Sequence, residues 1–313
     1  MPAVFLPPEA FGHEISLSES DSILDLQGGN SWDVATRYHE FKSKPSMQGL
    51  AKQLRRLSAQ AILERAQAIL GSVVHPLEQK LAPLSELPSD ALQPDIDLEE
   101  TMENAPLAVF EGQLESEKAI LADQDVWMTY QTHRRQSVVL SVDTSLSMTG
   151  EKLALTAVAL AVVLLQFPED PIGIVAFENE AKVLKQPHER ISIDQLVERF
   201  LDVPAQGYTH LEDGLRAAFR MLKGIRFHGG IKPPSTVLLT DGKYTAGRDP
   251  AYLASWFPHL VVIKMGRERA SLGLCKELAD RGRGVLREVG ELDALPVVMY
   301  SVVKDLLRGR SLG

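Results

Sequence analysis

The chain has 313 residues, of which 44% are hydrophobic, and carries a formal net charge of −9 at pH 7. This length allows one large domain or two ordinary ones, and the apolar content can support a full core. The acidic balance argues against nucleic-acid binding through a general positive field, and the single cysteine excludes an internal disulfide framework and a cysteine-based zinc site.

Residues 1–135 are predicted to form a helical N-terminal region, because strand signals are sparse there. Residues 46–70 place apolar side chains along one stripe of a long helix. Residues 97–103 could form a short helix, and residues 126–130 an extra strand that leads into the next domain. Longer helices are not expected between residues 76 and 106, because prolines interrupt this stretch: Pro83, Pro88, Pro94 and Pro106. We expect the region to pack on the following domain.

The acidic charge is concentrated in residues 78–125, which hold thirteen Asp or Glu residues against Lys80 and Lys118. The rest of the chain is close to neutral, with 31 basic and 29 acidic residues. We interpret the acidic segment as a solvated face or linker, because a run of like charges is usually solvated. The alternative is a surface for a basic partner.

From residue 136 to residue 308, β-branched runs alternate with helical patterns. Strands are predicted at residues 136–142, 171–177, 181–186, 235–240, 260–265 and 285–289. Helices are predicted at residues 150–167, 193–202, 210–223, 250–257, 272–281 and 292–308. This alternation is typical of βαβ units, and the tight turn at residues 178–180 indicates a hairpin. We therefore predict a doubly wound α/β fold, with a mainly parallel sheet and one antiparallel edge strand, followed by a tail at residues 309–313.

Five oxygen-bearing side chains lie at the ends of predicted elements. Asp143, Ser145 and Ser147 stand in VVLSVDTSLSM, Thr209 in GYTHLEDGL and Asp241 in STVLLTDGK. Both aspartates come just past a predicted strand, and such sheets bind ligands outside the carboxyl ends of their strands. Mg²⁺ prefers about six oxygen ligands, and two carboxylates with three hydroxyls leave a place for an outside group. The sequence thus predicts a site for Mg²⁺, with Mn²⁺ or Ca²⁺ as alternatives.

Taken singly, these residues have simpler explanations: Asp143 and Thr209 could cap the helices that follow them, and Asp241 could be a turn residue. Together they resemble the metal-ion-dependent adhesion site (MIDAS) of von Willebrand factor type A (VWA) domains. That pattern is D-x-S-x-S on the first loop, Thr on the second and Asp on the third, and all five positions are filled in order. The resemblance covers about residues 137–307, and Leu146 stands where the family usually has glycine.

The VWA resemblance implies that Ser145, Ser147 and Thr209 contact the ion, and that Asp143 and Asp241 often act through water. A Glu or Asp of a partner protein would take the open coordination place. The resemblance also implies a switch, in which the last helix at residues 292–308 moves when the ligand binds.

A narrower resemblance concerns the segment that enters the α/β domain. IDLEETMENA followed by QTHRRQSVVLSVDTSLSMTGEKLAL is similar to this segment in intracellular prokaryotic CoxE-like proteins and in the A-domain subunit of magnesium chelatase. Such proteins work beside a hexameric AAA+ ATPase of the MoxR type. The resemblance implies a cytoplasmic, non-catalytic adaptor with a chaperone-like role in protein remodelling or metalloenzyme maturation. The stretch MPAVFLPPEAFGHEI fits this location, because it lacks the basic start of a secretory signal.

Two other functions stay open, a Mg²⁺-dependent phosphohydrolase and a surface adhesin. The sequence contains neither a P-loop motif nor an H-E-x-x-H motif, and no further acid or histidine is placed beside the site by sequence. The lack of a signal, an anchor or a disulfide argues against an adhesin. The longest apolar run, residues 153–167, is shorter than the roughly 20 residues that cross a bilayer, so no membrane span is expected.

Overall fold

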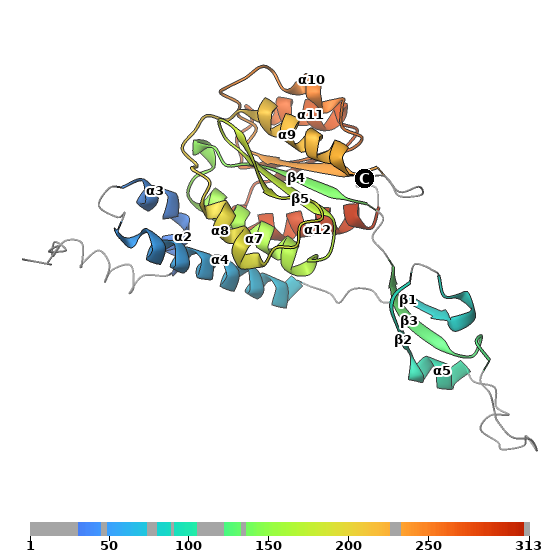
Figure 1. Cartoon of the computed structure of the whole chain (residues 1–313). Coiled ribbons are helices and arrows are strands. Elements are labelled where there is room, and N and C mark those ends of the chain that lie inside the picture. Colours follow the sequence, from blue (N-terminus) through green and yellow to red (C-terminus); the bar gives the residue numbers. More distant parts are fainter. Residues whose placement is uncertain are drawn as a thin grey trace, which may run out of the picture.

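The computed structural model describes residues 31–44, 49–73, 80–88, 91–104, 122–132, 136–225 and 233–309. Its main body is a six-stranded sheet in the order β6-β5-β4-β7-β8-β9 (Figure 1). The strands are β4 (Val138–Asp143), β5 (Ile172–Phe177), β6 (Ala181–Lys185), β7 (Ser235–Thr240), β8 (Leu260–Met265) and β9 (Leu286–Val289). All neighbours run parallel except β6, which forms a hairpin with β5. The predicted fold class, with one antiparallel edge strand, is confirmed.

Helices cover both faces of this sheet, which is why its central strands are buried throughout and mostly apolar. Every residue of β4, β5, β7 and β8 is buried. One face carries α7 (Glu151–Gln166), α8 (Ile193–Leu201) and α12 (Leu295–Leu307), and the other carries α9 (Leu211–Gly224), α10 (Ala251–Ala254) and α11 (Leu272–Arg281) (Figure 1). A hydrophobic core lies on each face of the sheet, and alternate residues of a strand pack into one core or the other. Leu140 and Val142 belong to the core with α7, and Val139 belongs to the core with α9.

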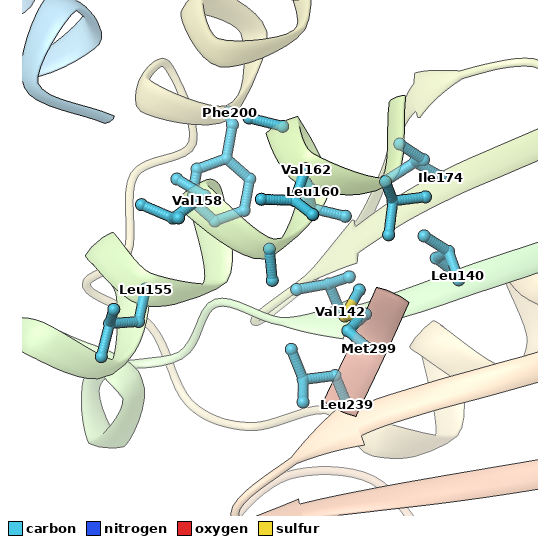
Figure 2. Packing of buried hydrophobic residues seen from close by; sticks show 14 of the residues in the cluster. Leu140, Val142, Leu155, Val158, Leu160, Val162, Ile174, Phe200, Leu239 and Met299 are labelled. Atoms are coloured by element: carbon cyan, nitrogen blue, oxygen red, sulfur yellow. The ribbon is translucent and has the colours of Figure 1, made fainter. Parts of the chain in front are cut away.

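Helix α7 is the most buried helix of the fold, with twelve consecutive buried residues from Leu153 to Leu164. Figure 2 shows Leu155, Val158 and Val162 of this helix among side chains of the sheet, of α8 and of α12. Its outer side is covered by α4 (Ala51–Val73), which also contacts α8 and α12. A helix enclosed in this way must be apolar on most of its surface, which explains the long apolar run in the sequence.

The N-terminal region is helical over its described residues 31–44 and 49–73, as predicted. Short helices α2 (Ser31–Thr36) and α3 (Tyr38–Ser43) precede α4, and their apolar residues join the core that contains α7. Leu54, Ile62 and Ala66 anchor α4 in that core. Part of the N-terminal region is therefore built into the α/β body.

The segment after α4 differs from the prediction, because it contains a second, antiparallel sheet. Its order is β1-β3-β2, with β1 (Lys80–Pro83), β2 (Ala91–Ile96) and β3 (Trp127–Thr132), and the short helix α5 (Leu98–Asn104) follows β2. The helix was predicted at residues 97–103. The strand predicted at residues 126–130 is present as β3, which is the central strand of this small sheet.

Proline explains why the small sheet was missed. Pro83 ends β1, and Pro94 lies where the β2 register shifts between Leu92 and Asp95. Both strands are edges of the sheet, where a missing backbone N–H need not break a ladder. Pro83 and Pro94 therefore do not prevent strand formation in this segment.

Several predicted features lie outside the described residues: the N-terminal stretch at residues 1–30, residues 105–121 of the acidic segment and the tail from residue 310. Among the helices that the structure does describe, none combines the length and the apolarity needed to cross a bilayer.

Candidate metal centre

The first ligand loop begins where β4 ends, at Asp143. Its carboxylate is fully buried; Oδ1 accepts a hydrogen bond from the backbone N–H of Ser145 (3.0 Å), and Oδ2 accepts one from the hydroxyl of Thr240 (2.7 Å). Thr144 donates both its backbone N–H and its hydroxyl to the carbonyl of Phe177, at the end of β5 (2.9 and 3.1 Å). The loop is therefore held to the strands on both sides of β4.

Leu146 does not disturb this loop. It begins a single 3-10 turn, Leu146–Met148, and its backbone N–H donates to the carbonyl of Gly207 (3.1 Å). Among the described non-glycine residues only Ala205 and Arg283 have a positive φ, so this turn does not require glycine at position 146. The Leu146 side chain is 62% exposed and points away from the core.

Three predicted ligands form one hydroxyl cluster. The Thr209 hydroxyl donates to the Ser145 hydroxyl over 2.8 Å, and the Ser145 and Ser147 hydroxyls lie 3.2 Å apart. Mg–O bonds of 2.0–2.1 Å at right angles place neighbouring ligand oxygens about 2.9 Å apart. The hydroxyl separations are hydrogen-bond distances, and they are also compatible with three oxygens that contact one Mg²⁺ ion.

Thr209 reaches the cluster because the third loop fixes its backbone. Its N–H donates to the hydroxyl of Thr245 (3.0 Å), and its carbonyl accepts from the N–H groups of Thr245 and Ala246 (3.1 and 3.3 Å). Thr209 and Ser145 are buried, whereas Ser147 is exposed. Ser147 therefore lies on the solvent side of the cluster.

Asp241 directly follows β7 and is fully buried. Its Oδ1 accepts from the backbone N–H of Lys243 (3.2 Å), while its backbone carbonyl accepts from the Ser271 hydroxyl (2.6 Å). Gly242 turns the chain with φ +78°, and a Cβ there would lie 2.6 Å from the sulfur of Cys275. Glycine is thus required beside Asp241 for both conformation and space.

The second carboxylate oxygen of Asp241 is the unsatisfied atom of the site. Oδ2 is buried and has no hydrogen-bond partner in the part of the chain that the structure describes. The ammonium groups of Lys152 and Lys243 lie 3.6 and 3.7 Å from it, beyond hydrogen-bond distance. A buried carboxylate oxygen with a free lone pair is a suitable ligand for a hard cation.

The ionisation of Asp143 is shifted by its burial. Burial raises the pKa of its carboxyl to about 6, the hydrogen bonds from Ser145 and Thr240 oppose this rise, and the nearby charge of Asp241 adds to it. Two buried carboxylates beside three hydroxyls are a hard-oxygen donor set. The residues present therefore fit a divalent cation such as Mg²⁺, although the described residues contain no cluster of three or more His, Cys, Asp or Glu side chains of metal-binding arrangement.

The sequence identified the candidate ligands but not the residues that hold them. By sequence, Thr240, Thr245 and Lys152 are ordinary parts of a strand, a loop and a helix, and only the structure shows their contacts with the site. The position of Thr240 gives one signal in the sequence. Thr240 directly precedes Asp241 at the end of its strand, and in parallel pairing such a residue lies opposite Asp143 at the end of the neighbouring strand. Lys152 carried no such signal.

Comparison with known proteins gives one family match. Residues 138–243 match the model of the von Willebrand factor type A domain. Solved structures with similar architecture include BatB, a conserved hypothetical protein from Bacteroides thetaiotaomicron (18% identity, 54% of this chain and 98% of that chain, TM-score 0.41). A von Willebrand factor type A protein from Catenulispora acidiphila aligns with 18% identity over 58% of this chain and 44% of that chain (TM-score 0.46).

Proximal thread matrix protein 1 from the mussel byssus, solved with a zinc-occupied MIDAS motif, aligns with 17% identity over 56% of this chain and about half (48%) of its own (TM-score 0.46). The family match begins at the first residue of β4 and ends just after Asp241, so it includes all three candidate ligand loops. This part of the chain is a von Willebrand factor type A domain.

Proposed function

We propose that the protein is a non-catalytic, metal-dependent adaptor, whose Mg²⁺ ion binds an acidic residue of a partner protein. In this proposal Asp143, Ser145, Ser147, Thr209 and Asp241 hold the ion, which offers its open place to a partner Glu or Asp. The observation that carries the proposal is the buried, unpaired Oδ2 of Asp241, which lies at the same edge of the sheet as the cluster of three hydroxyls. Mn²⁺ or Ca²⁺ could occupy the same oxygen set.

The rim of the site supports a protein as the ligand. Each loop that carries candidate ligands also exposes one large apolar side chain: Leu146 (62% exposed), Tyr208 (69%) and Tyr244 (40%). Leu146 lies between Ser145 and Ser147, Tyr208 precedes Thr209, and Tyr244 lies in the turn after Asp241. Exposed aromatic and aliphatic side chains around a polar centre are typical of protein-binding surfaces. A small phosphorylated substrate would not need them.

We propose further that the partner is a MoxR-type AAA+ ATPase, and that the pair acts in protein remodelling or metalloenzyme maturation. An adaptor needs a second binding surface, and in this proposal the small sheet would supply it. Its described residues, 80–88, 91–104 and 122–132, contain eight acidic residues and one lysine, and expose Ile96, Leu98 and Met102. Because an AAA+ ATPase consumes ATP, this proposal places the protein in the cytoplasm.

Metal-dependent capture of partners tests the proposal. The purified full chain would be incubated with native extract in Mg²⁺ or in EDTA, beside Asp143→Ala and the site-distant variant Thr236→Val. We expect a hexameric ATPase in the Mg²⁺ lanes of the wild type and of Thr236→Val only. Equal capture in every lane would show that the metal does not make the contact.

Hydrolysis of p-nitrophenyl phosphate, with and without Mg²⁺, tests the competing hypothesis of a phosphohydrolase. We expect no turnover above the Asp143→Ala background. Mg²⁺-dependent turnover that Asp143→Ala abolishes would overturn the non-catalytic assignment. An adhesin would be indicated if cell fractionation recovered the protein on the cell surface.

A further inference from the structure

Two lysines from different elements direct their ammonium groups at the same carboxylate oxygen. Lys152 lies in the first turn of α7 and Lys243 lies in the loop after β7, yet their Nζ atoms are 3.6 and 3.7 Å from Oδ2 of Asp241. Lys152 also donates to the carbonyl of Ser147 (3.3 Å), and Lys243 lies 3.4 Å from a carboxylate oxygen of Glu268. Both lysines thus touch the metal centre without being candidate ligands.

The two lysine contacts neutralise the negative charge of Asp241 but do not provide a hydrogen bond to its Oδ2. Asp241 is fully buried, and a buried carboxylate is strongly destabilised without a nearby opposite charge. At 3.6–3.7 Å the ammonium groups supply that charge, while the lone pair of Oδ2 accepts no hydrogen bond within the described ranges. The oxygen is therefore electrostatically compensated and still able to bind a cation.

Charge counting shows what metal binding would change. The two ammonium groups carry the same total charge as one divalent cation, and they lie beside the same oxygen. When a cation binds there, its two positive charges and those of the two lysines total four, whereas Asp143 and Asp241 supply two negative charges. Lys243 is 44% exposed and already contacts Glu268, so it can move away from the ion while keeping that contact. Lys152 is only 18% exposed and is held close to the centre.

We infer that Lys152 and Lys243 act as a counter-charge, meaning positive charges of the protein that take the place of the cation beside Asp241. In the metal-free protein they compete with the divalent cation for Asp241. When the cation is bound, they pair with the carboxylate of the acidic ligand that the cation binds. The lysines would lower the affinity of the free protein for metal and raise the preference of the loaded site for an acidic ligand. The second effect rests on the proposed function, whereas the first rests only on the metal site.

The first effect is tested with Mn²⁺ alone, by isothermal titration of the metal-free full chain. Lys243→Gln and Lys152→Gln are expected to raise the affinity for Mn²⁺ by about tenfold each, because each removes one repelling charge near the ion. Lys223→Gln is the matched control. It removes the same charge from the C-terminal end of α9, whereas the metal centre adjoins the start of that helix. Equal affinities for the wild type and all three variants would overturn the inference.

The second effect is tested with two short peptides, acetyl-Leu-Glu-Leu-amide and its Gln counterpart, added to Mn²⁺-loaded protein. Broadening of the peptide proton signals by bound Mn²⁺ reports binding at the ion. We expect broadening for the Glu peptide only, and weaker broadening with Lys152→Gln or Lys243→Gln under full Mn²⁺ loading. Undiminished broadening with both variants would exclude this role for the lysines.

The two experiments separate the inference from the proposed function. If the lysine variants bind Mn²⁺ more tightly but no peptide is broadened with any protein, the counter-charge stands and the acidic-ligand function fails. If the Glu peptide binds and Mn²⁺ affinity does not respond to either lysine, the function stands and the inference fails. Lys243→Gln alone decides the outcome if Lys152→Gln does not fold, because the Lys243 side chain is partly exposed.

Discussion

The hydroxyl of Thr240 donates a hydrogen bond of 2.7 Å to Oδ2 of Asp143, and so joins the last residues of two neighbouring parallel strands. The β4–β7 register pairs Val142 with Leu239, so the next residues along the two strands, Asp143 and Thr240, lie opposite one another. The bond fixes the plane of the carboxylate and occupies one of its oxygens. Asp143 is thus positioned by the sheet itself, before any cation binds.

Removing this bond is expected to weaken metal binding. Partners that orient a ligand typically contribute roughly 10–100-fold to metal affinity, and we expect a loss in this range for Thr240→Val. Thr236→Val is the control, because Thr236 is also buried in β7 but its hydroxyl has no hydrogen-bond partner among the described residues. Titration calorimetry with Mn²⁺ measures both. Similar affinities for the two variants would mean that the bond does not orient Asp143.

Stabilisation by metal is expected to depend on pH. The pKa of Asp143 is raised from 3.8 to about 6 in the folded, metal-free protein, so this protein loses stability as pH rises from about 4 to about 6. A cation binds the ionised carboxylate and offsets that loss. The increase in Tm caused by Mg²⁺ should therefore be small at pH 5, grow through pH 6 and level off above pH 7.

Melting curves with Mg²⁺ and with EDTA at each pH measure this increment. The buried imidazole of His39, whose pKa burial lowers to about 4, makes the folded state less stable as pH falls below 6.5. It affects both samples equally, so its effect cancels in the difference. Asp143→Asn should abolish the pH dependence of the increment, and a wild-type increment that is constant from pH 5 to pH 8 would contradict the assignment.

Helix α4 is expected to unfold together with the α/β body. Ile62 is fully buried in the core that α4 shares with α7. Ile62→Ala should lower the free energy of unfolding by about 2–4 kcal/mol, because truncation leaves a cavity. Ile96→Ala, at a residue that is 52% exposed, should change it by less than about 0.5 kcal/mol. Urea denaturation checks this, and an unchanged main transition for Ile62→Ala would show that α4 is not part of the core.

A Cβ at position 284 is expected to disturb the outer part of the sheet. It would lie 2.0 Å from the backbone oxygen of Leu260, the first residue of β8, and backbone cannot move aside as a side chain can. Gly284→Ala should therefore cost about 1–3 kcal/mol. Gly273→Ala, in α11 with open space around the site of the added Cβ, should be neutral or stabilise by up to about 1 kcal/mol. Thermal unfolding of the two variants distinguishes these outcomes.

The amino-acid sequence determined the elements of the α/β domain and the position of the candidate ligands. Buried parallel strands are apolar along most of their length, and the helices between them have their own period, so both are visible as local patterns. The same patterns place Asp143 at the end of β4 and Asp241 just past the end of β7. Topology then brings both to one edge of the sheet, which is why the candidate site could be predicted without coordinates.

Only the tertiary structure decided which side chains support that site and where the N-terminal region lies. The bond from Thr240 to Asp143 and the approach of Lys152 to Asp241 join segments 97 and 89 residues apart in the chain, and no local period records such pairs. The small sheet was hidden for a related reason. Its prolines are acceptable because β1 and β2 are edge strands, and a strand is an edge or a centre only through its neighbours in space.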